Sequence, residues 1–234
     1  MLYCKIINSQ LFTKLDRFFD QFNSAHLYKK GEIILRADDN PSGVYYLKKG
    51  FVRLYAISRE GQEITFNIFK PGSYFSMMWA IANTTNHHFF EAMTAVELQR
   101  APKEKLLEFI KSQPDVLFEL TRRILIGLSG LITEMEYLLF GNANIKVASV
   151  ILLLAKRFGQ KKTNGGVVIQ HPFTHRMIAS IAGLTRETTT LEIQKLKQEK
   201  VLTQKQHLLV VRNIKKLEEK LAIFKEEESV PDTF

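Results

Sequence analysis

A heptad pattern between residues 114 and 140 constrains the fold of this 234-residue chain more than any other feature. Its seam positions alternate in steps of four and three residues over three heptads: Leu117, Thr121, Ile124, Leu128, Leu131, Met135 and Leu138. A 3.5-residue repeat keeps one stripe facing a partner helix along its whole length, which a two-stranded coiled coil requires. The segment therefore predicts a long helix that forms a homodimer. A buried helix with a wide apolar face is the alternative.

A second apolar stripe lies beside the seam and recurs every seven residues: Phe118, Leu125, Ile132 and Leu139. Our interpretation is that the seam faces a partner helix while the second stripe packs on the chain's own N-terminal domain. Gly141 and Asn142 then break the helix and predict a hinge. We expect an N-terminal domain over residues 1–113, a dimerisation helix over 114–141 and a C-terminal domain over 142–234.

Residues 25–101 are typical of short strands separated by turns. The predicted strands cover residues 26–28, 32–36, 44–47, 51–57, 63–69, 89–94 and 96–100, and several are rich in β-branched and aromatic residues. Glycines at positions 31, 43, 50, 61 and 72 punctuate them, and glycine supplies the positive φ that tight hairpin turns need. Many short strands at this spacing predict a sandwich or barrel, a group that includes the double-sheet jelly roll.

The net charge of +9 is concentrated in the C-terminal part of the chain. Residues 1–141 hold 17 Lys and Arg against 15 Asp and Glu, whereas residues 142–212 hold 12 against 3. The remaining residues hold 4 against 6. A basic segment joined to a nearly neutral one indicates an anionic polymer as the partner. A solvated basic face is the alternative.

Residues 174–202 carry the pattern of a helix-turn-helix. Thr174 and Thr185 are placed to cap two helices, and Gly183 is placed to end the first helix in a left-handed conformation. The inner face of the second helix is expected to comprise Thr189, Ile193 and Leu196. Two helices joined by a short glycine-containing turn form the DNA-binding motif of many regulators.

The residues expected to face outward from this motif predict contact with DNA. First-turn residues of a recognition helix meet base edges, where Arg186 can bind guanine and Glu187 can accept from cytosine N4. A solvated pair at a helix start is the alternative. Residues 203–211 predict a β-hairpin wing whose tip lacks glycine, followed by an amphipathic helix of unassigned role. The predicted DNA contacts are Thr174, His175, Arg176, Thr185, Arg186, Glu187, Thr190, Leu191, Gln194, Lys195, Lys197 and Lys205.

The order of these segments resembles the Crp/Fnr (cyclic-AMP receptor protein) family of transcription regulators. GVYYLKKGFVRLY at residues 43–55 and GLTRETTTLEIQKLKQEKVL at residues 183–202 carry the resemblance. It implies an α+β fold with an N-terminal β jelly-roll sensor domain, a long dimerisation helix and a C-terminal winged helix-turn-helix domain. It also implies a homodimer that binds a palindromic operator in double-stranded DNA and works with RNA polymerase. Arg186 and Glu187 match the family's base-reading residues, but Leu191 stands where many members carry a second base-reading Arg.

The sensor segment departs from the members that bind cyclic nucleotides. Those members have a Gly-Glu-Leu turn, where Ser76, Met77 and Met78 stand here, and a later phosphate-binding Arg, whose position falls at His87 or His88. Neutral imidazole is a poor substitute for a permanent positive charge. We therefore expect no response to cyclic AMP and predict no cofactor. The candidate pocket, Tyr74, Phe75, Ser76, Met77, His87 and His88, either takes an unknown apolar effector or is a filled core.

Other function classes fit the sequence less well. Cys4 is the single cysteine, which excludes disulfide frameworks and four-thiolate sites within one chain. The chain has no phosphate-binding glycine loop, HExxH motif or nucleophile elbow, so we predict that it is not an enzyme. His87 and His88, taken as adjacent strand residues, point to opposite faces and predict no metal site. The absence of a secretory signal or a membrane-length apolar run predicts a cytoplasmic protein without membrane contact.

Overall fold

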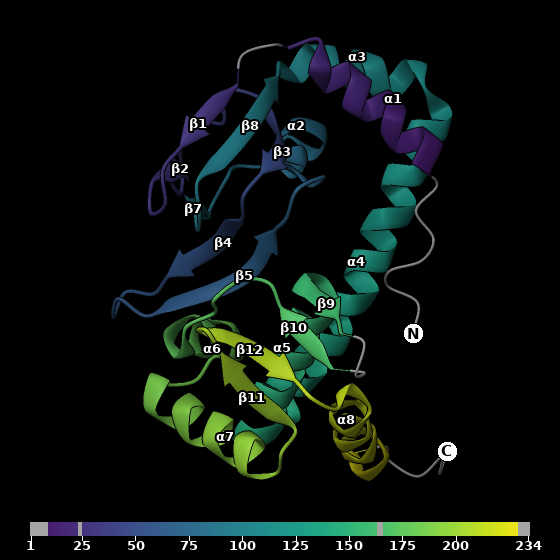
Figure 1. Cartoon of the computed structure of the whole chain (residues 1–234). Coiled ribbons are helices and arrows are strands. Elements are labelled where there is room, and N and C mark those ends of the chain that lie inside the picture. The colour runs from purple at the N-terminus through teal and green to yellow at the C-terminus, as the bar shows by residue number, and fades with distance from the viewer. Residues whose placement is uncertain (1–8, 23–24, 163–165, 229–234) are drawn as a thin grey trace, which may run out of the picture. The chain divides into compact units, whose positions relative to one another are not determined.

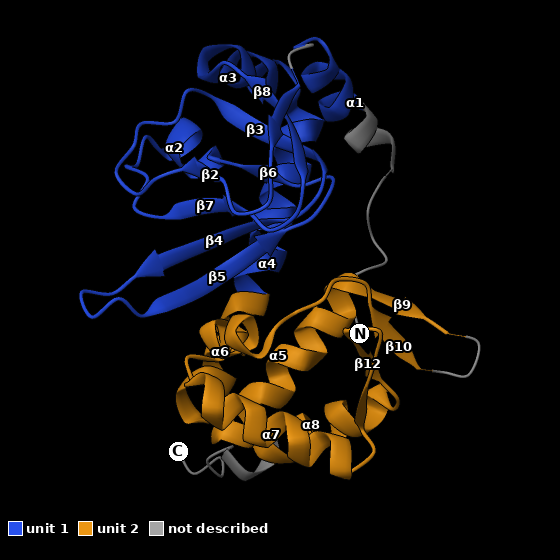
Figure 2. Ribbon diagram, turned by 60° about the vertical axis from the view of Figure 1, so that its left-hand side comes forward, with its two compact units in different colours: residues 1–129 blue, residues 130–234 orange. Residues whose placement is uncertain are grey.

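The computed structural model describes residues 9–22, 25–162 and 166–228. It divides into two compact units, residues 1–129 and 130–234, coloured separately in Figure 2. The helix α4 (Pro114–Phe140) crosses the division between them. Residues 1–8, which include Cys4 and most of the N-terminal segment predicted to hold no secretory signal, lie outside the described residues.

Unit 1 contains two four-stranded antiparallel sheets (Figure 1). The first holds, in spatial order, β1 (His26–Tyr28), β8 (Val96–Ala101), β3 (Val44–Lys49) and β6 (Tyr74–Phe75). The second holds β2 (Ile33–Leu35), β7 (Phe89–Ala92), β4 (Val52–Ile57) and β5 (Glu63–Phe69). The predicted double-sheet fold is confirmed. Strand β6 and helix α2 (Met77–Ala82) were not among the predicted elements.

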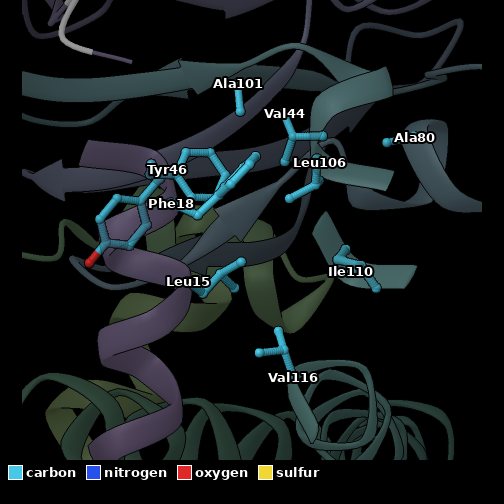
Figure 3. Close-up of a cluster of buried hydrophobic side chains, with 10 residues drawn as sticks. Leu15, Phe18, Val44, Tyr46, Ala80, Ala101, Leu106, Ile110 and Val116 are labelled. Atoms are coloured by element: carbon cyan, nitrogen blue, oxygen red, sulfur yellow. The ribbon is translucent and has the colours of Figure 1, made fainter. Parts of the chain in front are cut away.

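Strand β3 lies between two hydrophobic clusters, because successive side chains on a strand point to opposite faces. Tyr45 and Leu47 join the inner cluster, to which both sheets contribute. Val44 and Tyr46 join the outer cluster, where α1 (Ser9–Asp20) and α3 (Lys103–Ser112) cover the first sheet (Figure 3). The sequence did not indicate α1, whose Phe18 stacks on Phe109 of α3 at 4.5 Å between ring centroids. Burial on both faces therefore fixes β3 at the centre of the unit.

Glycine turns connect several of these strands as predicted. Gly31, Gly50, Gly61 and Gly72 all have positive φ, between 80° and 87°. At Gly50 a side chain is also excluded by space, because a Cβ atom would lie 2.3 Å from the carbonyl oxygen of Ala95. Both constraints select glycine at the β3–β4 turn.

One face of α4 packs on unit 1, but it is not the predicted face. The buried residues of the helix are Val116 and Glu119, and Leu120 packs against the outer cluster. The prediction that the second stripe packs on the chain's own domain is wrong for Phe118 and Leu125, its members within unit 1, because their side chains are 70% and 59% exposed. Val116, Glu119 and Leu120 share a helical face, with spacings of three and four residues. When this face packs inward, the second stripe points away from the core of the unit.

Unit 2 is a helical domain with one antiparallel sheet. Its helices are α5 (Ala143–Phe158), α6 (His175–Ala182), α7 (Arg186–Gln198) and α8 (Ile214–Glu228). The sheet order is β11 (Leu202–Lys205), β12 (Leu208–Val211), β10 (Val167–Ile169) and β9 (Gly159–Lys161). Helix α5 is buried along much of its length and contacts α6, α7 and α8. Strand β9, whose Lys161 pairs with Val167 of β10, was not among the predicted elements.

Among the described residues, no helix is both long enough and apolar enough to span a membrane.

Candidate nucleic-acid interface

The turn between α6 and α7 is built by local capping interactions. Thr174 Oγ1 accepts a hydrogen bond from the backbone N–H of Met177 at 3.2 Å. Gly183 ends α6 with φ of 63°, and Thr185 Oγ1 accepts from the N–H of Thr188 at 3.1 Å. Threonine caps stabilise a helix start by satisfying a backbone donor that has no partner within the helix. The predicted caps and left-handed turn are all present.

Helix α7 has a buried face and an exposed face. Thr189, Ile193 and Leu196 are fully buried, as the spacing predicted. Arg186, Glu187 and Gln194 are exposed, and Leu191 exposes 58% of its surface. A large apolar side chain in solvent among polar neighbours is suited to contact with another molecule. These four residues form the exposed face of α7, and the name is kept for them below.

Thr190 is half-buried and joins the first turns of α6 and α7. Its Oγ1 donates a hydrogen bond to the carbonyl oxygen of Arg186 at 2.8 Å. The same oxygen lies 2.9 Å from Nδ1 of His175, the first residue of α6. The Thr190 hydroxyl is therefore already engaged within the protein.

The predicted phosphate-contacting lysines differ in their surroundings. Lys195 Nζ forms an ion pair with Glu192 Oε1 at 2.7 Å. Lys197 Nζ donates to Gln204 Oε1 at 3.0 Å, which connects α7 to strand β11. Lys205 ends that strand and is exposed, as is Arg176 in the first turn of α6. Basic side chains thus come from both helices and from the wing strand.

A buried polar network behind α7 was missed by sequence reasoning. Glu192 is buried, and its Oε2 accepts from Asn144 Nδ2 of α5 at 2.8 Å. Lys220 Nζ of α8 donates to Asn144 Oδ1 at 2.7 Å and to Glu199 at 3.3 Å. A signal was available, because Glu192 lies three residues after Thr189 and therefore on the same helical face.

The pKa of Glu192 is lowered in this network. Burial acts to raise the pKa of the carboxyl, but hydrogen bonds from Lys195 and Asn144 outweigh it, together with the charges of Lys195 and Lys220. Glu192 is thus held as a carboxylate beneath the exposed face of α7. The network ties α5, α7 and α8 together.

The wing turns tightly without glycine. Lys205 pairs with Leu208, so Gln206 and His207 form a two-residue loop. Both have positive φ, 48° and 65° respectively. Positive φ at both central residues is the geometry of a type I′ hairpin turn, whose second residue is normally glycine. Because the sequence has no glycine at this tip, Gln206 and His207 both adopt the left-handed conformation that glycine would adopt more easily.

The candidate effector-pocket residues on β6 and α2 face opposite sides of the first sheet. Tyr74 faces the outer cluster and donates from its hydroxyl to Asp16 Oδ1 at 2.9 Å. Phe75 faces the inner cluster and stacks on Tyr45, with ring centroids 5.1 Å apart. Ser76 is buried with φ of 65°, and Met77 packs against the outer cluster. The structure thus does not bring these four side chains to one place.

The two candidate histidines lie in the segment before β7, not on a strand as we had taken them to be. His87 Nδ1 lies 2.9 Å from Asp38 Oδ1, in an exposed pair. The ring of His88 instead meets Phe66 edge-on at 5.1 Å. The two histidines therefore contact different residues. Within the described part of the chain, no group of three or more His, Cys, Asp or Glu is arranged to hold a metal ion.

The predicted dimer seam of α4 is largely exposed. Leu117, Ile124, Leu128, Leu131 and Met135 are all exposed. Thr121 is exposed too, and its hydroxyl donates to the carbonyl oxygen of Leu117 within the helix at 2.9 Å. Leu138, at the end of the seam, is half-buried. The seam and the second stripe together form a broad exposed apolar surface.

Two family models match the chain. A cyclic nucleotide-binding domain matches residues 25–113, and a Crp-like helix-turn-helix domain matches residues 145–220. The first match contains the sensor segment, and the second contains α6, α7 and the wing.

Curated proteins and solved structures are similar over most of the chain. The Global nitrogen regulator of Nostoc sp. is 30% identical over 182 residues, which are 75% of this chain and 79% of that protein. The Cyclic AMP receptor protein of Thermus thermophilus is 27% identical over 193 residues, 82% of this chain and 86% of that protein. A crystal structure of a transcriptional regulator of the CRP/FNR family, also from Thermus thermophilus, superposes with a TM-score of 0.68 at 25% identity. The match covers 85% of this chain and 98% of that one.

Proposed function

This chain belongs to the Crp/Fnr family of transcription regulators, and on that premise we propose that it binds a palindromic operator in double-stranded DNA as a homodimer. The observation that carries the proposal is the exposed face of α7, which begins with Arg186 and Glu187 above a buried inner face. In a helix-turn-helix, residues at the start of the second helix are the ones that reach base edges in the major groove.

Three residues of this face have distinct roles in the proposed complex. Arg186 binds O6 and N7 of a guanine, and Glu187 accepts a hydrogen bond from cytosine N4. Leu191 has no hydrogen-bonding group in its side chain and contacts a thymine methyl instead. Thr190 was predicted to contact DNA, but we assign it a different role because its hydroxyl is engaged by Arg186 and His175. Thr190 thus orients the helix while its neighbours read the bases.

The basic residues around this face supply contacts that do not depend on sequence. Lys197 and Lys205 lie at the junction of α7 with the wing, and Arg176 lies in the first turn of α6. We assign these three to phosphates. Lys195 contributes less, because its ammonium group is paired with Glu192.

The broad apolar surface of α4 supports the homodimer. The seam supplies the 3.5-residue repeat, and the adjoining second stripe widens the surface that a second copy would cover. Apolar side chains on so long a helix are stabilised by burial against a partner, since large exposed apolar patches are rare on monomers. Two-fold symmetry then places the half-sites of the operator about one helical turn, or ~34 Å, apart.

We further propose that cyclic AMP is not the effector. Phe75 lies among stacked aromatic rings between the two sheets. Its ring centroid is 5.1 Å from that of Tyr45 and 5.1 Å from that of Phe90. His87, one of the two residues at which the phosphate-binding Arg of nucleotide-binding members would fall, is exposed and paired with Asp38. Isothermal titration calorimetry with cyclic AMP should show no binding. A micromolar dissociation constant would contradict this part of the proposal.

The remaining roles follow from regulation of transcription. We propose that the protein acts with RNA polymerase in the cytoplasm, is not an enzyme, and has no cofactor.

Salt dependence tests DNA binding. Neutralised phosphates release counterions, so affinity for a mixed-sequence duplex should fall by orders of magnitude between ~50 mM and ~200 mM salt. Lys197→Ala should lower affinity for all sequences alike and reduce the salt slope by about one contact. Fluorescence anisotropy measures both quantities. Gln198→Ala is the matched control on the same helix and should leave the slope unchanged. An affinity that does not change with salt would contradict the proposal.

A further inference from the structure

The hydrogen bonds around Thr190 fix which ring nitrogen of His175 carries a proton. Thr190 has one hydroxyl proton, and it is donated to the carbonyl oxygen of Arg186 at 2.8 Å. The hydroxyl oxygen must therefore accept from His175, whose Nδ1 lies 2.9 Å away. Nδ1 consequently carries a proton in this arrangement. In the neutral ring Nε2 is then an acceptor and has nothing to donate.

Protonation of His175 leaves this arrangement intact. An imidazolium ring keeps the proton on Nδ1 and gains one on Nε2, so the hydrogen bond to Thr190 survives. The change is confined to the other side of the ring, which gains a positive charge and a donor. His175 thus differs from a histidine whose protonation breaks a structural hydrogen bond.

The surroundings of the ring disfavour its charged form in the free protein. The pKa of His175 is lowered first by burial and then by the positive charges of Lys197 and Arg186 on α7. Arg176 is the adjacent basic residue on α6 itself. A phosphate at this position would act in the opposite direction, because an anion near the ring favours its charged form.

We propose that His175 is a proton-dependent phosphate contact, which takes up a proton when DNA binds and then donates from Nε2 to a phosphate oxygen. The inference rests on the proposed function, since it requires DNA at the exposed face of α7, where Thr190 connects His175 to Arg186. The proposed contact depends on Thr190, because the Thr190 hydroxyl keeps the proton of the neutral His175 ring on Nδ1.

The direction of the pH effect follows from linkage. If the bound form of the protein holds more protons than the free form, affinity rises as pH falls from the pKa of the DNA-bound ring toward the lower pKa of the free ring, and it levels off below the latter. When a protomer takes up one proton on binding, its contribution to the affinity gains at most about tenfold per pH unit. At a pH well above the pKa values of both forms, affinity should not change with pH.

The experiment measures affinity of the full chain for a mixed-sequence duplex from about pH 8 to about pH 5.5, at constant ionic strength. Wild type should bind more tightly as pH falls. His175→Asn keeps a donor at the position of Nδ1 but cannot titrate, and should give weak binding that does not change with pH. His175→Arg carries a permanent charge and should bind tightly throughout. His207→Asn, at the wing tip, is the matched control and should retain the wild-type profile.

The outcomes separate this inference from the proposed function. Salt-dependent binding with equal pH slopes in wild type and His175→Asn would overturn the inference and leave DNA binding in place. If the change of DNA affinity with pH is lost in His207→Asn but kept in His175→Asn, the proton is taken up at the wing, and the inference is also overturned. No DNA binding by wild type at any pH would overturn both.

Nitrogen-15 spectra of the imidazole rings give a second test that does not depend on the variants folding. In the free wild-type protein at neutral pH, His175 should show the proton on Nδ1. Its titration midpoint should shift upward when DNA is added. A midpoint that is the same with and without DNA would contradict the proposal.

Discussion

Asn144 on α5 donates a hydrogen bond of 2.8 Å from Nδ2 to Oε2 of Glu192, a buried carboxylate on the recognition helix α7. The oxygen of the same amide accepts from Lys220 on α8 at 2.7 Å. One side chain therefore bridges three helices. It fixes the inner side of the helix whose outer side is proposed to read DNA.

Replacing Asn144 tests this bridge. Asn144→Ala should lower the free energy of unfolding by about 1–3 kcal/mol, because it leaves a buried charged acceptor short of a donor. Asn144→Asp keeps the acceptor for Lys220 but removes the donor to Glu192 and places a second carboxylate against it, so it should also be less stable than wild type at neutral pH. Urea unfolding followed by circular dichroism measures both. If Asn144→Asp is as stable as wild type at neutral pH, the amide does not donate to Glu192.

The same network has a pH signature. The pKa of Glu192 lies below its ordinary value in the folded protein, so its contribution to stability is present above that ordinary value and is lost as pH falls through the lowered pKa. Asn144→Asp should respond in the opposite direction, since protonation of either carboxyl relieves their repulsion. The difference in stability between Asn144→Asp and wild type should therefore shrink as the solution is acidified.

The wing turn predicts a stabilising substitution. His207 has φ of 65° in a two-residue turn, where a side chain is disfavoured and glycine is not. His207→Gly should raise the free energy of unfolding by about 0.5–1 kcal/mol, after allowance for the greater freedom of glycine in the unfolded chain. Lys205→Gly, in the strand beside the turn, is the control and should lower stability. Thermal unfolding that shows both variants destabilised would contradict the assigned turn.

The homodimer proposal depends on the centre of the α4 seam. Leu128→Lys would bury two like charges there, at a cost of several kcal/mol for each unpaired ion. Sedimentation velocity should then show a monomer. Ser129→Lys is the matched control, because its side chain lies one residue round the helix from the seam, and it should remain dimeric. A dimeric Leu128→Lys protein would show that the seam is not the interface.

The recognition motif was predictable because its signals are local. Thr174, Gly183 and Thr185 act on backbone groups within a few residues of themselves, and the structure places each in the predicted role. The strand–turn pattern of unit 1 was readable for the same reason. Helix α1 was missed because its clearest role, the packing of Phe18 on Phe109, joins residues far apart in the sequence.

Contacts between distant segments account for the other differences. Heptad spacing identified two stripes on α4 but could not say which face meets unit 1, and Phe118 proved to be exposed. Tyr74 and Phe75 were grouped in one pocket, although neighbours on a strand point to opposite sides. The bond between His175 and Thr190 spans fifteen positions and depends on the angle between two helices, which sequence spacing does not define.

Selection of binding sites from random DNA tests the central claim most directly, with wild type, Glu187→Ala and Leu191→Arg compared in parallel. Wild type should select an inverted repeat that keeps a G·C pair opposite Glu187 and favours A·T opposite Leu191. Glu187→Ala should relax the choice at one base pair in each half-site, at a cost of about 1–3 kcal/mol for each pairing lost, and Leu191→Arg should shift preference toward guanine at its own position. If Glu187→Ala selects the same half-site as wild type with the same stringency, then α7 does not read bases in the way proposed here.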